Sequence, residues 1–308
     1  MTHTTAPGYP GVGPGRYVTV GDRRTWYAEA GEGTAVVFVY GGNFGPVTQA
    51  GGSNAAAWST AFGPLSAHHR VVAYDKLGHG FSDSPGSDPD DYTMAAVVRH
   101  LIDLVETLDL APIHLVGHSR GGYIATRAAL LRQDLVRSLT IVNSGTLGPG
   151  VGTNAVALAG CPYPAETREA KRWVNQRYCY DPSTVTDEWI DATYLTMSAE
   201  GYRSARDTVV AGRLLERVFW PQLAKEKRET IGWLSEGRLQ RPTQIIWGRD
   251  DRTARVGLGF DLFRTISAHE RDTALAVVDK CGHFPYREHP AWFNDVVTTF
   301  VTRIDNAY

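Results

Sequence analysis

Short apolar runs alternate with helical spacings along most of the chain. Apolar runs predict buried strands at 35–40, 70–74, 113–116, 139–142, 244–247 and 274–278, and two more strands, 16–20 and 25–30, meet at a Gly21-Asp22 turn. Helical periods separate them at 54–66, 94–108, 123–131, 259–266 and 291–304. Such alternation forms right-handed βαβ crossovers, so we predict an α/β fold with a mostly parallel central sheet and helices on both faces.

The alternation stops between residues 145 and 241. This stretch shows helical spacing at 166–178, 186–197 and 206–218, no clear strand, and many aromatic residues. It is either ordinary helical packing or a lid whose inner face lines an apolar pocket, and the two interpretations are compatible. We therefore expect a flexible leader (1–15), a core domain (16–144 and 242–308) and an inserted helical cap (145–241).

Composition excludes several classes of protein. The 308 residues are 43% hydrophobic and 21% charged with a net charge of −2, which is unlike a disordered chain and offers no basic excess for nucleic acid. Three cysteines do not make a disulfide framework. The leader lacks the pattern of a signal peptide, and no apolar stretch is long enough to span a membrane. We expect a cytoplasmic protein whose partner is a small-molecule substrate, not nucleic acid or a membrane. The protein could also form a homodimer.

The candidate nucleophile is Ser119, in the G-x-S-x-G segment Gly117-His118-Ser119-Arg120-Gly121. An apolar strand precedes this segment and a helical run follows it, which is the context of a nucleophile elbow. The serine oxygen would be exposed at the carboxyl edge of the sheet, and the amide of Arg120 would donate to a developing oxyanion. The alternative is a glycine-rich turn with an incidental serine.

A serine nucleophile needs a base, and the base needs an acid. His283 follows the last predicted strand, which gives the chain order Ser, acid, His. Asp251 follows the strand at 244–247 and is preferred over its neighbour Asp250. The other plausible place for an acid holds Asn143 and Ser144, and neither can carry the charge.

The second oxyanion donor should come from the glycine-rich loop after the strand at 35–40. The amide of Gly42 is the first choice and Asn43 the next. A dinucleotide site is the alternative, but the G-x-G-x-x-G spacing is absent, and no metal motif occurs, so no cofactor or metal is expected. We assign substrate contacts to a further set of residues: Asn43, His118, Phe284, Tyr194 and Trp220.

These motifs together resemble the α/β-hydrolase fold with a helical cap, and the likeness covers nearly the whole chain. Its pieces are the segments 27–33, 75–83, 117–121, 248–251 and 282–285. Within that fold the chain is similar to meta-cleavage-product hydrolases, which cut a carbon–carbon bond in vinylogous 1,5-diketones. The segments that carry this likeness are 32–39, 180–183, 186–188 and 249–252.

Three departures from that group are visible. Tyr40 stands where the group has His before the oxyanion glycine, and His118 stands where it often has Asn. The group's carboxylate-binding Arg falls near Thr193 and Tyr194, where no Arg stands. Its substitutes could come from elsewhere in the cap: Arg203, Arg206 or Arg213.

We therefore predict a cofactor-independent serine hydrolase for a small, largely apolar or aromatic carbonyl substrate: an ester, a lactone or a vinylogous diketone. Ser119 would attack the carbonyl carbon, His283 would act as base and then acid, and Asp251 would orient it. The rivals are a non-hydrolytic lyase or cyclase, and a ligand receptor on the same scaffold.

Overall fold

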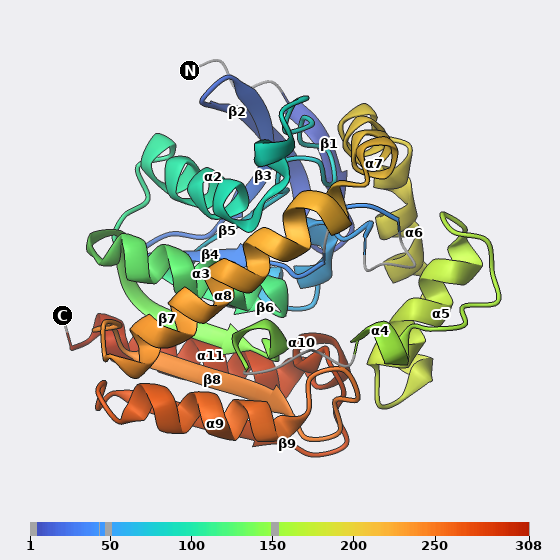
Figure 1. The fold of residues 1–308 in the computed structure, drawn as a ribbon. Helices are drawn as coiled ribbons and strands as arrows, with labels where there is room; N and C mark the ends of the chain where they lie inside the picture. Colours follow the sequence, from blue (N-terminus) through green and yellow to red (C-terminus); the bar gives the residue numbers. More distant parts are fainter. Residues whose placement is uncertain (1–4, 43, 47–50, 149–153, 308) are drawn as a thin grey trace.

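The computed structural model describes residues 5–42, 44–46, 51–148 and 154–307. One nine-stranded sheet crosses the described part of the chain in the order β1-β2-β3-β5-β4-β6-β7-β8-β9 (Figure 1). The first strands pair antiparallel as far as the β3–β5 pair, and every later pair is parallel. The strands are β1 Thr5–Tyr9, β2 Gly13–Val20, β3 Arg23–Ala30, β4 Ala35–Val39, β5 Arg70–Tyr74, β6 Ile113–His118, β7 Val136–Val142, β8 Thr243–Gly248 and β9 Thr273–Val278.

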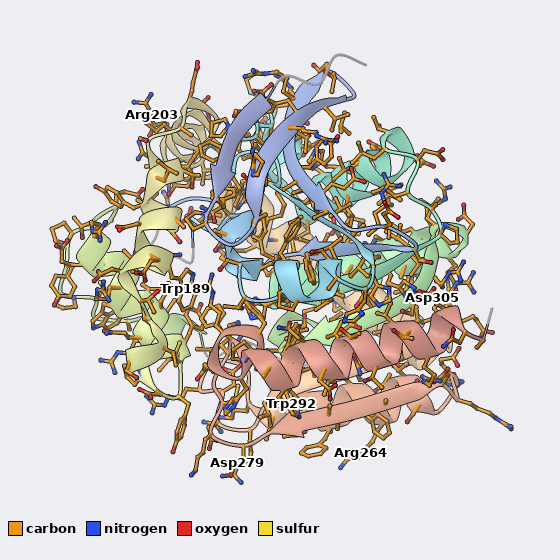
Figure 2. The ribbon with its side chains drawn as sticks, turned by 180° about the vertical axis from the view of Figure 1, so that it is seen from behind. Trp189, Arg203, Arg264, Asp279, Trp292 and Asp305 are labelled. Carbon is orange, nitrogen blue, oxygen red and sulfur yellow. The ribbon has the colours of Figure 1, made fainter. Side chains whose placement is uncertain are left out.

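Helices cover both faces of the sheet, as predicted. One layer holds α2 (Met94–Thr107), α3 (Arg120–Leu131), α8 (Trp220–Ser235) and α9 (Val256–Ser267). The other holds α1 (Phe62–Ser66) and α11 (Pro290–Asp305), seen from behind in Figure 2. The short α10 (Pro285–Glu288) leads into α11. The predicted fold class is therefore confirmed.

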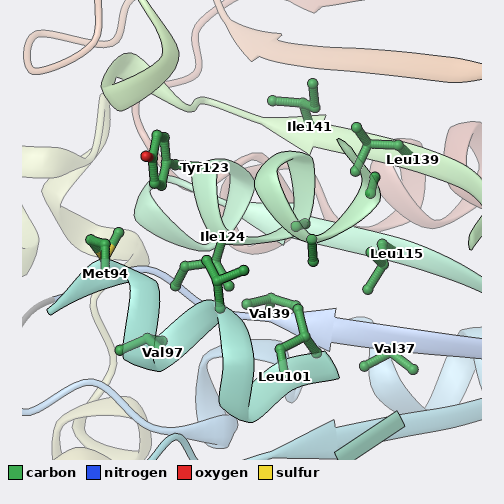
Figure 3. Close-up of a cluster of buried hydrophobic side chains, with 14 of the residues drawn as sticks. Val37, Val39, Met94, Val97, Leu101, Leu115, Tyr123, Ile124, Leu139 and Ile141 are labelled. Carbon is green, nitrogen blue, oxygen red and sulfur yellow. The ribbon is translucent and has the colours of Figure 1, made fainter. Parts of the chain in front are cut away.

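Strand β4 shows how side-chain alternation fills both layers. Val37 and Val39 belong to the apolar core under α2 and α3 (Figure 3), whereas Val36 and Phe38 belong to the core under α1 and α11. All four are fully buried. Successive side chains of a strand point to opposite faces, so a strand between two helical layers must be apolar throughout.

The predicted flexible leader is wrong for residues 5–15. Thr5–Tyr9 pairs with β2 as an edge strand, and Tyr9 is buried with its hydroxyl donating to Asp75 Oδ2 at 2.6 Å. Gly15 is needed there, because a Cβ at that position would lie 2.0 Å from the Trp26 indole nitrogen. A segment rich in Gly and Pro shows no strand pattern, yet its backbone can still pair when a neighbouring strand is available.

No strand lies in the described residues between β7 and β8, and besides α8 and two short 3-10 helices this segment holds helices that gather at one end of the sheet (Figure 1). They are α4 Asn154–Ala157, α5 Arg168–Tyr178, α6 Asp187–Met197 and α7 Glu200–Gly212, followed by a π-helical turn Leu215–Phe219. The helix predicted at 206–218 is wrong, because the chain breaks at Arg213, whose φ is 48°. Likewise the segment 54–66 is split into a 3-10 helix Ala55–Trp58 and α1.

Helix α8 does not belong to the cap, so the predicted cap boundary at residue 241 is too late. It lies across α3 in the sheet-covering layer (Figure 1). Arg127 of α3 donates to Thr230 Oγ1 at 2.7 Å, and Tyr123 lies 3.3 Å from the same oxygen. Helical periodicity gives an apolar face but does not say which layer covers it. No helix in the described residues is long and apolar enough to cross a membrane.

Candidate active site

Ser119 lies at a sharp turn between β6 and α3. Its φ of 55° and ψ of −123° are backbone angles that a non-glycine residue rarely adopts. The flanking glycines make the turn sterically possible, since a Cβ on Gly121 would lie 2.0 Å from the Val39 carbonyl oxygen and one on Gly117 2.4 Å from the Gly121 oxygen. The Ser119 carbonyl accepts the Ser144 hydroxyl at 2.6 Å. The turn therefore presents Ser119 at the carboxyl edge of the sheet, where it lines a pocket.

His283 and Asp251 are brought together at the same edge. Asp251 Oδ2 lies 2.6 Å from His283 Nδ1, and both side chains are buried. His283 lines the same pocket as Ser119. Asp250, the competing acid, turns away: its amide donates to the Cys281 carbonyl and its carboxylate lies near Arg249. The geometry thus selects Asp251 as the residue that orients the histidine.

The carboxylate of Asp251 is held in its ionised form. Burial alone would raise the pKa of Asp251, but the charge and hydrogen bond of His283, the Ala254 amide and the Asn143 amide keep that pKa below its ordinary value. Oδ1 also accepts the amide and hydroxyl of Thr253, each at 2.8 Å. An ionised acid fixes the protonated Nδ1 tautomer of His283, which leaves Nε2 free to act as a base.

Asn143 holds this acid, a role that sequence reasoning missed. Its Nδ2 donates to Asp251 Oδ2 at 2.7 Å and its Oδ1 accepts the Gly248 amide at 3.1 Å. Its φ of 44° lies in the left-handed region, which Asn tolerates better than most residues. Its position directly after the strand at 139–142 is one that suits an acid, and this is the signal that the sequence offers. An amide there supports the acid supplied by the next strand.

The backbone of His283 is anchored from two sides. Its amide donates to the Tyr178 carbonyl of the cap at 2.9 Å, and its carbonyl accepts His118 Nε2 at 2.8 Å. The Tyr178 ring stacks on the imidazole with centroids 4.9 Å apart. The Glu288 carboxylate accepts the adjacent Gly282 amide at 3.0 Å. The histidine loop is therefore held by both the core and the cap.

His118 is committed to this anchoring. Because Nε2 donates to the His283 carbonyl, Nδ1 accepts the Tyr286 hydroxyl at 3.1 Å. Burial, together with repulsion from His283 and Lys76, lowers the pKa of His118, so the ring is neutral. Both nitrogens are engaged within the protein, which excludes His118 as the base. His118 and Phe284, two of the predicted substrate contacts, both line the pocket.

The predicted oxyanion donors flank the serine. A Cβ built on Gly41 would lie 2.8 Å from Ser119 Cβ, so the loop after β4 passes directly over the nucleophile. Gly42 follows with a φ of 82°, and both glycines line the pocket. Arg120 is the first residue of α3, where backbone amides lack an intrahelical partner. Asn43, the second choice of donor and a predicted substrate contact, lies outside the described residues.

Two predicted substrate contacts are wrong. Tyr194 and Trp220 are 40% and 39% exposed, and neither is among the residues that line the pocket. On α6 it is Trp189 and Thr193 that line it, because residues four apart share a helical face and Tyr194 is turned outward. The Trp220 ring instead lies outside the pocket against the Arg120 guanidinium, 5.0 Å away.

None of the three cap arginines considered as a carboxylate partner reaches the pocket. Arg203 points outward on α7 (Figure 2), Arg206 pairs with Glu166 and Asp207, and Arg213 is exposed. All three lie on or after α7, which packs beyond α6 instead of over the serine.

Three other side chains supply positive charge and free donors to the pocket. They are Arg120 of α3 and, one helical turn apart on α5, Lys171 and Asn175. Burial lowers the pKa of Lys171 to about 8 and that of Arg120 to about 10, so both are largely cationic at neutral pH. Arg120 Nε and Asn175 Nδ2 are buried without a hydrogen-bond partner. No Asp or Glu is among the described residues that line this pocket.

Comparisons with known proteins show the family to which this fold belongs. Residues 36–296 match the model of the Alpha/beta hydrolase family. The chain belongs to the alpha/beta hydrolase family. A 2-hydroxy-6-oxononadienedioate/2-hydroxy-6-oxononatrienedioate hydrolase of Burkholderia vietnamiensis is 30% identical over 294 residues, which cover 91% of each chain. Its counterpart in Paraburkholderia xenovorans is 29% identical over 286 residues, again 91% of each chain.

The solved structures agree. The meta-cleavage product hydrolase of Pseudomonas fluorescens IP01 superimposes with a TM-score of 0.76 at 24% identity, over 95% of this chain and 98% of that one. This likeness shows the alpha/beta hydrolase fold. The predictions of the fold, of a hydrolase and of a likeness to meta-cleavage-product hydrolases are therefore confirmed.

Proposed function

We propose that this alpha/beta hydrolase cleaves the carbon–carbon bond of a vinylogous diketone that carries a carboxylate, with Ser119, His283 and Asp251 as its catalytic triad. The observation that carries the proposal is the pocket itself. It joins the serine and histidine to two cations and two unpartnered donors, and no acid lines its described part. Buried donors without partners are costly unless a ligand satisfies them. The relatives that are 29–30% identical are hydrolases named for dioate substrates of this kind.

The proposed chemistry follows from the order of the groups. After the dienol has ketonised, Ser119 Oγ attacks the ketone carbon as His283 Nε2 takes its proton. The Gly42 and Arg120 amides stabilise the oxyanion, each donor contributing about 3–4 kcal/mol to the transition state. The carbon–carbon bond then breaks, and His283 returns the proton to the departing carbon. Water, deprotonated by His283, releases the acyl group from Ser119.

The carboxylate would bind on the α5 side of the pocket. Lys171 and Asn175 are 6% and 3% exposed and project from one face of α5. The Lys171 ammonium lies 3.5 Å from the Gly51 carbonyl, a long contact that a carboxylate could replace. An ammonium and an amide NH₂ recognise one carboxylate from two directions, whereas the Arg of the related hydrolases would do so with one planar group.

The triad is tested with Ser119→Ala and a fluorophosphonate. The variant should lose turnover, keep substrate binding and escape labelling, while the wild type is labelled at Ser119. Turnover in the variant at the wild-type rate would refute the triad. A folded wild type that is not labelled would favour the lyase, cyclase or receptor alternatives.

The substrate class is tested by comparing a dienoate diketone with its methyl ester. Lys171→Met and Asn175→Leu should raise KM for the free acid by about tenfold or more, consistent with losing a charged hydrogen bond. They should leave KM for the ester nearly unchanged. Tyr194→Ala, on the outer face of α6, is the control for both. Equal effects on acid and ester would contradict carboxylate recognition, and faster turnover of simple esters would favour an esterase.

We further propose a cytoplasmic enzyme without nucleic-acid or membrane partners, monomeric or as a homodimer. Support comes from the free thiols of Cys161, Cys179 and Cys281, which suit a reducing compartment. Cell fractionation and light scattering of the purified protein test these points. Recovery of the protein in a membrane pellet would contradict the cytoplasmic location.

A further inference from the structure

Lys76 is a buried cation beneath the loop that passes over Ser119. It lies two residues after the end of β5 and is 2% exposed. Its ammonium donates to the Gly41 carbonyl at 2.9 Å, lies 3.4 Å from the Tyr40 carbonyl, and sits 4.4 Å from the centre of the Tyr40 ring. The ammonium is therefore directed at the backbone of the glycine-rich loop.

The neighbouring carboxylate does not explain this placement. Asp75 Oδ1 accepts the Ala55 amide at 2.8 Å, and Oδ2 accepts the Tyr9 hydroxyl at 2.6 Å and the Phe81 amide at 2.9 Å. Among the described residues, the direct contacts of the Lys76 ammonium are thus with peptide carbonyls and an aromatic face, and Asp75 acts on it only through its charge. Burying an ammonium costs several kcal/mol, so an apolar side chain would serve stability better here.

The bond to Gly41 has a geometric consequence for Gly42. A trans peptide is planar, and its C=O and N–H point in opposite directions. Fixing the Gly41 oxygen on the Lys76 side therefore fixes the Gly42 N–H on the opposite side, and Gly41 already lies against Ser119 on the pocket wall. A cation bound to the carbonyl also polarises the peptide and strengthens its N–H as a donor.

We propose that Lys76 is a positioning residue that orients and polarises the Gly41–Gly42 peptide as a donor of the oxyanion hole. Tyr40 is its partner: the ring provides a face for the ammonium and its hydroxyl accepts the Lys76 amide at 3.0 Å. This role rests on the proposed function, since it presumes an oxyanion at Ser119.

If Lys76 polarises the oxyanion loop through its charge, kcat should depend on the protonation state of Lys76. Asp75, Tyr40, His118 and Arg120 face the ammonium from the surrounding elements. Burial and repulsion by Arg120 lower the pKa of Lys76 to about 7, although Asp75 opposes the shift. The ammonium is present below that pKa and is lost as the pH rises through it. The polarisation of the loop should therefore weaken on the alkaline side.

The test compares Lys76→Met, which keeps length but loses charge, with Lys76→Arg, which keeps the charge at all accessible pH values. Acylation rates with a p-nitrophenyl ester and kcat and KM with the best substrate are measured from pH 5.5 to 9. Losing one oxyanion donor costs roughly 10²–10³-fold in kcat. Lys76→Met should lose at least about tenfold in kcat with little change in KM. Lys76→Arg should retain most of the wild-type kcat, and its kcat should not decline at alkaline pH as that of the wild type does. Exposed Lys225→Met on α8 is the control.

A purely structural role makes a different prediction. Lys76→Met would then change the melting temperature but, once folded, would match the wild type in kcat and in the alkaline limb, which would overturn the proposal. If Lys76→Met does not fold, an alkaline limb that persists in Lys76→Arg overturns it equally. If the role of Lys76 is wrong but the triad is right, Ser119→Ala will still be inactive. If the triad is wrong, Ser119→Ala will retain turnover, so the two failures can be distinguished.

Discussion

Replacing Asn143 tests whether the acid of the site is held by this amide. Asn143→Ala removes the 2.7 Å bond to the Asp251 carboxylate and a weaker 3.3 Å bond to the Gly282 carbonyl, and it leaves the Gly248 amide without its acceptor. A hydrogen bond to a charged group contributes about 1.5–3 kcal/mol, and an unpaired buried amide costs about 1–3 kcal/mol. Alanine in the left-handed region adds about 1 kcal/mol. Added together, these contributions predict a loss of about 3.5–7 kcal/mol in the free energy of unfolding.

The backbone contribution can be separated from the hydrogen bonds. Asn143→Gly is relaxed at a φ of 44° but loses the same side-chain hydrogen bonds, so it should be about 1 kcal/mol more stable than the alanine variant. Urea unfolding followed by circular dichroism measures both. A loss below about 1 kcal/mol in the glycine variant would refute the reasoning, because the hydrogen bonds to Asp251 and Gly248 would then contribute little.

The same variant should change the pH dependence of stability. The folded pKa of Asp251 is lowered, so its ionisation stabilises the fold above the unfolded pKa and that contribution disappears as pH falls through the folded pKa. Removing a donor raises the folded pKa of Asp251. The gap between wild type and variant should therefore be widest near pH 7 and should narrow in acid. A gap that stays constant from pH 7 to pH 3 would contradict an electrostatic role.

Three further predictions concern the loop, the core and the cap. Gly41→Ala should lower kcat at least about tenfold, because its Cβ would lie 2.8 Å from Ser119 Cβ and displace the oxyanion loop; steady-state kinetics at unchanged melting temperature checks this. Thr230→Val should cost about 1–3 kcal/mol in urea unfolding, since it loses the 2.7 Å bond from Arg127, yet leave kcat unchanged because α8 packs against α2, α3 and α9 and none of its residues lines the pocket. Tyr194→Ala should change kcat/KM by less than about twofold, because the side chain is 40% exposed outside the pocket; a larger loss would indicate that Tyr194 contacts the substrate.

Much of the fold could be predicted from local sequence. The strand at 70–74 coincides with β5, and the strand before the elbow differs from β6 only at its end. Buried parallel strands are continuous apolar runs, and such runs are visible in the sequence alone. The pairing of β1 was not visible, because Gly and Pro show no strand pattern and the pairing depends on the neighbour β2.

Some residues of the candidate site could likewise be predicted from the sequence, and others could not. Ser119, Asp251 and His283 follow strands in the chain order of a triad, so motif and order alone predicted them. Tyr194 was misplaced because an aromatic residue on an amphipathic helix does not reveal which face it occupies until α6 is packed. The packing of α6 within the cap turns the Tyr194 side chain outward.

The sequence by itself determined the sheet, the elbow and the triad candidates, because each depends on residues adjacent in the chain. Only the tertiary structure decided which polar groups support them. Asn143 reaches Asp251 across 108 positions, and Lys76 reaches Gly41 across 35. Arg120, Lys171 and Asn175 converge on one pocket from two helices. Hydrogen bonds and charges act over a few ångströms in space, and the spacing of residues along a chain does not specify that distance until the chain is folded.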